Sequence, residues 1–220
     1  MHYPKSSWPI HTSALFLRAT LYLLVTGAIA QGAYMEALYL PKTLQFSELG
    51  FIELNQTVFL ALSCGLLLYV RQRLQVWPMV TLLLLAFIGS SLIREQDALL
   101  DHYAGRHVWK ILVTIVILPI VVWVGIHWRR FLDELYEYSN SFSLGLFTAG
   151  LFTTYAFSRL YGRKIFWQAI MEDHYLGDIK SMAEEVVELL GYSLILFAMI
   201  ELLLLARRIY HARQQTAPDS

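Results

Sequence analysis

Acidic side chains gather near the ends of three apolar segments of this chain. Glu53 stands just inside one apolar stretch, and Glu184 and Glu188 open another. Carboxylates close to hydrocarbon usually face a bundle interior or a water-filled cavity, where they pair with bases, bind a cation or relay a proton. We therefore predict one polar cluster with these members: Glu53, Asn55, Arg94, Glu95, Asp97, Asp101, Glu184, Glu185 and Glu188.

Helical spacing groups several of these residues. Glu184 and Glu188 share one helix face, and Asp97 and Asp101 share another, because residues four apart are neighbours on a helix. One interpretation is a structural salt-bridge cap, in which the acids are neutralised by Arg94, Arg106 and Lys110. The other is a site for a cation, a proton or a lipid headgroup. We expect neutralisation of Glu53, Glu95 or Glu188 to reduce function more than a change at Glu36 or Glu48.

Three histidines belong to the same region as the acids and suggest a divalent metal ion as a cofactor. His102 and His107 follow the Asp97–Asp101 face, and His174 lies in a Glu-Asp-His-Tyr sequence. Mixed imidazole and carboxylate ligands suit a divalent metal. His102 and His107 are five residues apart, so only a turn at residues 103–105, rather than one helix face, would bring them together.

Glu53-Leu54-Asn55, with Ser63 further along the same segment, loosely resembles the second-span pattern of the alkaline-ceramidase-type transmembrane hydrolases. Members of that family are zinc-dependent lipid amidases whose sites use a Ser, an Asp and three His. They have seven spans and a late H-x-x-x-H motif, and this chain has neither. The chain is therefore not assigned to that family. The residues by themselves leave open an alternative function, a membrane-embedded metal-dependent lipid hydrolase, with these candidate ligands: Glu53, Asp101, His102, His107 and His174.

We predict an interfacial loop over residues 159–183, which combines basic and aromatic residues. Such a mixture is typical of a helix that lies in the membrane interface and touches lipid phosphates. We predict lipid-headgroup contact by Arg159, Arg163, Lys164 and Trp167.

The composition explains why the charges are confined to segment ends. The chain has 220 residues, of which 57% are hydrophobic and 15% charged, with a formal net charge of zero and one cysteine. These values exclude a disordered chain, an intrachain disulfide and a nucleic-acid binder that relies on bulk positive charge. They favour an all-α polytopic membrane protein, because a spanning helix needs about 20 mostly apolar residues.

Six segments approach the length of a membrane span. We predict a single transmembrane domain over residues 1–211, followed by a disordered tail at 212–220. Within the fifth segment, Gly145, Ala149 and Thr153 recur four apart, which predicts a close helix-packing face. The predicted spans are about 13–33, 51–70, 78–93 with a helical extension to 100, 109–128, 142–158 and 186–206.

Paired arginines follow three of these spans and set the expected orientation. The positive-inside rule places Arg71/Arg73, Arg129/Arg130 and Arg207/Arg208 in the cytoplasm, together with both termini. The polar cluster then lies on the extracytoplasmic side. Glu201 falls on the cytoplasmic side, where we expect it to pair with Arg207 or Arg208. An Ala-Ile-Ala sequence at 28–30 leaves open that the first span is a cleaved signal peptide.

The stretches 93–102 and 184–192 also look like segments of small bacterial inner-membrane proteins. We therefore expect a multi-pass protein of the cell inner (plasma) membrane. Its expected function is that of a binding or structural/assembly component that holds a cation or lipid headgroup, in contact with membrane lipids and other membrane proteins. The alternatives are the lipid hydrolase and a proton-coupled transporter.

Overall fold

The computed structural model describes residues 10–39 and 50–216, and over these ranges the secondary structure is entirely helical. Short π-helical or 3-10 segments interrupt or extend several helices. The elements in chain order are α1 (Thr12–Tyr39), α2 (Phe51–Tyr69), η1 (Val70–Leu74), α3 (Pro78–Glu95), α4 (Asp97–Ala104), α5 (Val108–Ile126), α6 (Trp128–Ser139), α7 (Phe142–Leu151), η2 (Phe152–Phe157), α8 (Ser158–Tyr161), α9 (Lys164–Met171), η3 (Glu172–His174) and α10 (Gly177–Thr216).

Five of the described helices are long and apolar enough to cross a membrane: α1, α2 with η1, α3, α5 and α10. Helices α3 and α5 have 18 and 19 residues. At about 1.5 Å per residue each is close to the roughly 30 Å of a bilayer's hydrocarbon core. The chain is therefore a helical multi-pass membrane protein.

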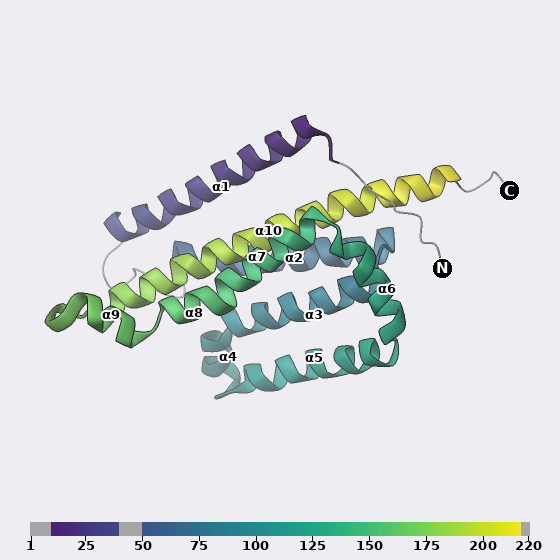
Figure 1. Ribbon diagram of the computed structural model, residues 1–220. Helices are drawn as coiled ribbons and strands as arrows, with labels where there is room; N and C mark the ends of the chain where they lie inside the picture. The colour runs from purple at the N-terminus through teal and green to yellow at the C-terminus, as the bar shows by residue number, and fades with distance from the viewer. Residues whose placement is uncertain (1–9, 40–49, 217–220) are drawn as a thin grey trace.

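The fifth predicted span, 142–158, corresponds to α7, η2 and α8 in succession. None of the three is long enough by itself to be a membrane span. Figure 1 shows them following one another alongside α10, in the opposite direction. A topology of six spans therefore remains a prediction.

The long helices alternate in direction, so the bundle has two distinct ends (Figure 1). We call one the α6 end: it contains η1, α6, the start of α1 and the end of α10. The other is the α9 end: it contains α4, α8, α9 and the start of α10. Segments that are distant in the sequence thus lie at the same end of the bundle. Helix α6 runs across the bundle at the α6 end.

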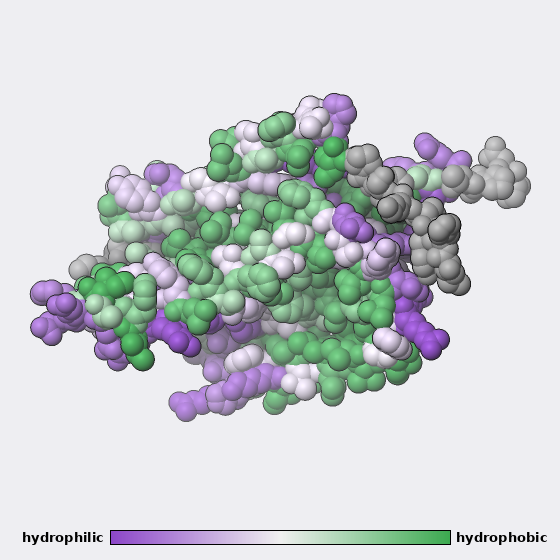
Figure 2. Space-filling model, viewed as in Figure 1, coloured by the Kyte–Doolittle hydropathy of each residue, from purple (hydrophilic) through white to green (hydrophobic). Residues whose placement is uncertain are grey.

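The core of the bundle surrounds α10. Its residues Tyr192, Met199 and Leu202 are buried against Leu67 of α2 and Ile88 of α3. By contrast, α1 and α5 leave most of their apolar side chains exposed, and in Figure 2 hydrophobic residues (green) cover the middle of the molecule. Such a surface suits contact with lipid chains, which are as apolar as the side chains.

Two predicted boundaries are corrected. The third span does not extend as one helix to residue 100, because α3 ends at Glu95 and α4 is a separate helix. The helix is interrupted at Gln96, where the chain tightens and the Gln96 N–H donates to the Ile93 oxygen three residues back. Helix α10 begins at Gly177, inside the predicted loop, and continues to Thr216, inside the predicted tail. Asp178 in its first turn and the Lys180–Glu184 pair favour the early start.

The predicted packing face of the fifth segment is also wrong. Helix α7 buries Gly150 rather than Gly145, and a Cβ at Gly150 would lie 2.7 Å from the Gly191 oxygen of α10. A Cβ at Gly145 would have nothing within 4 Å, and the Thr153 hydroxyl bonds back to Ala149 of its own helix. The close approach uses Gly150 and Gly191, because two facing glycines allow the backbones to come nearest.

Glu201 does not pair as predicted. Its carboxylate accepts hydrogen bonds from Arg18 and Tyr22 of α1, at 2.7 and 2.8 Å. Arg207 instead lies over the Tyr69 ring. The cause is the side-by-side position of α1 and α10, which a sequence alone does not reveal.

Candidate functional site

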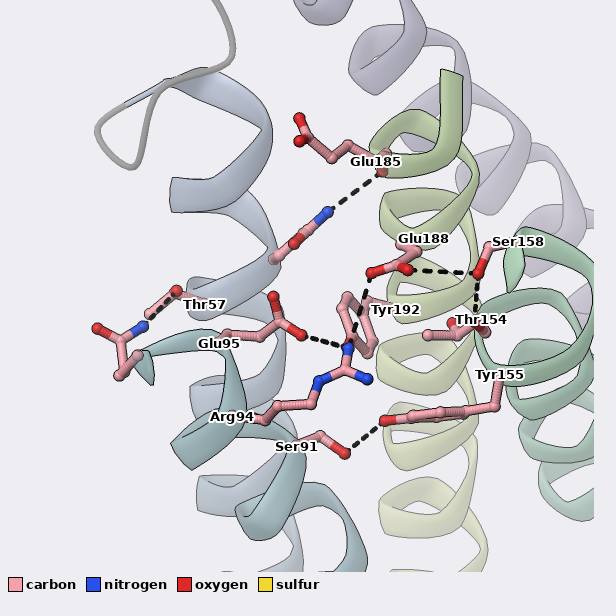
Figure 3. A network of polar contacts seen from close by, with 12 residues as sticks. Thr57, Ser91, Arg94, Glu95, Thr154, Tyr155, Ser158, Glu185, Glu188 and Tyr192 are labelled. Carbon is pink, nitrogen blue, oxygen red and sulfur yellow. Dashed lines mark hydrogen bonds and ion pairs between the residues drawn. The ribbon is translucent and has the colours of Figure 1, made fainter. Parts of the chain in front are cut away.

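Glu188 of α10 is the centre of a network of ion pairs at the α9 end. Figure 3 shows its contacts with Arg94 and Ser158. Its side chain is buried, with 6% of the residue exposed. One carboxylate oxygen lies 3.0 Å from Arg159 of α8, and the other lies 3.7 Å from Arg94 of α3. One acid thus links three helices.

Glu95 and Tyr192 complete the α3 side of this network. Glu95 accepts hydrogen bonds from Arg94 and from the Tyr192 hydroxyl, each at 2.7 Å. Arg94 also donates to the Tyr192 oxygen at 3.0 Å. Glu188 and Tyr192 are one turn apart on α10, so both face α3.

Glu184 extends the network by another turn of α10. It pairs with Arg159 at 2.8 Å and with Lys180 four residues earlier on the same helix. Arg159 is therefore shared between Glu184 and Glu188. Its side chain remains 49% exposed, so the network reaches from the bundle interior to the surface.

The π-helical turn η2 helps to place the α8 residues. The Ser158 N–H bonds to the Thr153 oxygen, five residues back, which leaves the Thr154 carbonyl for the Ser158 hydroxyl. The same hydroxyl lies 3.3 Å from Glu188. Because a π turn rotates the residues that follow it, Ser158 and Arg159 both face α10.

Tyr155 and Ser91 close the network on its inner side. Their hydroxyls are hydrogen-bonded at 2.5 Å. The Arg94 guanidinium lies 5.6 Å from the centre of the Tyr155 ring, a cation–π geometry. Sequence reasoning missed Tyr155, Ser158 and Tyr192. Only Tyr192 had a usable signal, namely its four-residue spacing from Glu188.

Some members of the predicted cluster lie beside the network rather than in it. Gln56 donates to the Glu185 backbone oxygen at 3.2 Å, and a Glu185 carboxylate oxygen is buried without a hydrogen bond from the described residues. Glu53 is half-buried in the first turn of α2. Asn55 donates to Phe51 of its own helix. The structure therefore joins Arg94, Glu95, Glu184 and Glu188, and leaves Asn55 out.

The other predicted residues of this end lie on the exposed helix α4 and the loops. Asp97 is in the first turn of α4, and Asp101 accepts the His107 N–H at 2.9 Å. His102, His107 and His174 are exposed. Within the described ranges, no three His, Cys, Asp or Glu side chains are grouped so that they could hold a metal ion. The described residues therefore do not bring the predicted donors together in such a group.

The basic and aromatic residues of the 159–183 segment divide into two groups. Arg159 belongs to the network, and the Trp167 indole donates inward to the Tyr161 oxygen at 2.9 Å, which ties α9 to α8. Arg163 and Lys164 are exposed at the start of α9. Lys164 lies near the Tyr175 ring. Arg159 is exposed but held in ion pairs, whereas Arg163 and Lys164 are exposed bases in no ion pair of this network.

The network balances its charges. Its ion pairs join the bases Arg94, Arg159 and Lys180 to the acids Glu95, Glu184 and Glu188. Buried ions that are paired in this way are costly to break, because removing one leaves its partner uncompensated. The arrangement is therefore suited to holding helices together, and it agrees with the salt-bridge interpretation of the cluster.

Comparisons of the chain with protein-family models, with curated proteins and with solved structures found no match.

Proposed function

We propose that this chain is a non-enzymatic membrane component that binds phospholipid headgroups at the α9 end and uses the ion-pair network as the scaffold of that site. The observation that carries the proposal is the sharing of Arg159 between Glu184 and Glu188. It ties α8 to α10, and it leaves Arg163 and Lys164 as the outward-facing bases next to it.

The surroundings of these two bases suit a lipid interface. Ile165 and Ile170 of α9 are exposed apolar residues, and the Tyr161 and Trp167 rings pack together beside them. Exposed apolar side chains with adjacent bases and aromatic rings are typical of a segment at the headgroup level. In this proposal the apolar residues enter the leaflet while Arg163 and Lys164 contact phosphate.

The charge balance also favours a headgroup over a cation as ligand. The three network acids already have bases as partners, so they offer no excess negative charge to a cation. The hydrolase is not proposed further, because the predicted ligands do not form a metal-holding group in the described residues. No observation favours the transporter.

We further propose six spans, with both termini in the cytoplasm of a cell inner membrane. The support is the set of arginines at the α6 end, Arg71, Arg73, Arg129, Arg130, Arg207 and Arg208. Lipids are the proposed partners, and other membrane proteins remain a second class of partner.

Native mass spectrometry of the full chain with phosphatidylglycerol tests the headgroup site. We expect the R163Q/K164Q variant to retain severalfold less phosphatidylglycerol than the original chain. Arg106→Gln is the matched control, because Arg106 is an exposed base at the same end. Equal retention by R163Q/K164Q and the original chain, or an equal loss in the control, would contradict the proposal.

A further inference from the structure

Helix α6 lies across the bundle rather than along it. Figure 1 shows it at the end where α5 stops and α7 begins, running across the direction of the long helices. If those helices cross a membrane, a helix in this orientation lies near the plane of the membrane surface. Its 12 residues mix aromatic, charged and apolar types.

One flank of α6 is fastened to the bundle. Tyr138 is buried in the core, and Phe131 packs against it. Glu134 accepts the backbone N–H groups of Met79 and Val80 at 2.6 and 3.1 Å, and so caps the first turn of α3. Glu137 accepts the Trp77 indole N–H at 2.7 Å. The roll of α6 about its own axis is therefore set by the body of the protein.

The adjacent flank carries apolar side chains that the bundle does not cover. Trp128, Leu132 and Tyr136 recur every four residues and are 56%, 44% and 67% exposed. Trp123 and Ile126, at the end of α5 and next to α6 in the chain, are also exposed. Since α5 is a membrane-crossing helix by length and composition, exposed apolar residues on both sides of the α5–α6 junction are consistent with contact between the α6 flank and the same lipid.

The remaining flank of α6 is polar. It carries the exposed base Arg129, Arg130, which pairs with Glu134, and the exposed acids Asp133 and Glu137. Arg73 of η1 and Arg207 of α10 add exposed bases at the same end of the bundle. Positive charge beside an apolar flank is complementary to a leaflet whose headgroups are anionic.

We propose that α6 is an interfacial helix that binds anionic phospholipid, with Trp128, Leu132 and Tyr136 in the leaflet and Arg129 and Arg73 at the phosphates. This surface is at the opposite end from the headgroup site on α9 and does not depend on it. Because contacts with the bundle fix the rotation of α6 about its own axis, only one flank of the helix enters the leaflet. Residues next to each other in the sequence therefore differ sharply in their depth in the membrane.

Spin labels on neighbouring residues test this depth difference. Single-cysteine variants Leu132→Cys and Asp133→Cys, each with Cys64→Ser, are placed in nanodiscs of phosphatidylcholine with phosphatidylglycerol. We expect the label at 132 to collide mainly with membrane-soluble oxygen and the label at 133 mainly with a water-soluble nickel chelate. Equal collision profiles at 132 and 133 would overturn the proposed placement.

The anionic preference needs a second measurement with the label at 132. We expect the label at 132 to collide severalfold more often with the nickel chelate in nanodiscs of phosphatidylcholine alone than in nanodiscs that contain phosphatidylglycerol. In the phosphatidylglycerol nanodiscs, we expect a similar increase when the label is placed in the R73Q/R129Q background. This background leaves the Arg130–Glu134 pair intact. Arg106→Gln, at the other end, is the matched control. A profile that is the same in both lipids and in both backgrounds would overturn binding to anionic lipid.

Discussion

Arg18 of α1 and Glu201 of α10 form an ion pair, with 2.7 Å between the guanidinium and the carboxylate, although 183 positions separate them in the sequence. Glu201 is only 3% exposed, and the Tyr22 hydroxyl donates to its second oxygen. The Tyr22 ring also stacks on Phe197 of α10. Since most of α1 faces outward, this contact is a principal attachment of α1 to the bundle.

Arg18→Gln should therefore destabilise the protein. It leaves the buried Glu201 without its base, which typically costs about 3 kcal/mol or more. The R18Q/E201Q double variant should be less destabilised than R18Q alone, because it removes the uncompensated charge. Unfolding by titration with a denaturing detergent measures these differences. Arg207→Gln is the control. If R18Q unfolds at the same detergent concentration as this control, the Arg18–Glu201 pair does not attach α1 to the bundle.

Alanine at Gly191 should separate α10 from the π-helical turn. A Cβ there would overlap the Thr154 hydroxyl and lie 2.9 Å from the Thr154 nitrogen. Overpacking of this kind costs about 1–3 kcal/mol. Gly145→Ala is the matched control, because its Cβ would have nothing within 4 Å. The unfolding midpoints of both variants can be measured in a thermal assay that follows the exposure of the thiol of Cys64, the single cysteine. An unchanged midpoint for Gly191→Ala is the contrary result.

Glu134→Gln should weaken the start of α3. The carboxylate accepts two backbone N–H groups there, and its charge favours a helix N-terminus. We expect a loss of about 1–2 kcal/mol, typical of a lost cap. Asp133→Asn, next to it and exposed, should change stability little. The two variants can be compared by detergent titration, and equal stabilities would contradict a capping role for Glu134.

Tyr192→Phe should loosen the contact between α3 and α10. The change removes a hydroxyl that donates to Glu95 and accepts from Arg94. The expected loss is about 1–2 kcal/mol, because charged groups lie on both sides of the hydroxyl. Tyr103→Phe, on the exposed helix α4, is the control. The thiol-exposure assay distinguishes them, and a Tyr192→Phe midpoint equal to that of the control would exclude this role.

Part of this site could be predicted from the sequence. Because successive spans run in opposite directions, the acids that follow Ile93 and those in the first turns of the last span are expected at the same end. Arg94, Glu95 and Glu188 do meet there. Bases close to these acids in the sequence suggested a salt-bridge cap. The prediction of carboxylates paired near one end therefore follows from span parity and from the cost of unpaired charge.

The remaining contacts depend on how the helices rotate and which of them are neighbours. A π-helical turn has no plain sequence signal, so the direction of Ser158 and Arg159 was hidden. The face containing Gly150 was misplaced because the sequence does not show that Gly191 of α10 lies opposite it. Glu36, expected to be less important, is buried and accepts the Ile52 N–H of α2. Glu48, paired with it in that expectation, lies outside the described residues.

Arg159 and Glu188 couple α8 to α10 through the ion-pair network, and a double-mutant cycle between the two residues measures this coupling. The stabilities of Arg159→Gln, Glu188→Gln and the double variant are compared with the original chain in the same detergent titration. Contacting residues of one network couple by about 0.5–3 kcal/mol. We expect a favourable coupling of about 1 kcal/mol or more between Arg159 and Glu188, smaller than that of a fully buried pair because Arg159 is half exposed. Additive effects of the two substitutions would contradict it.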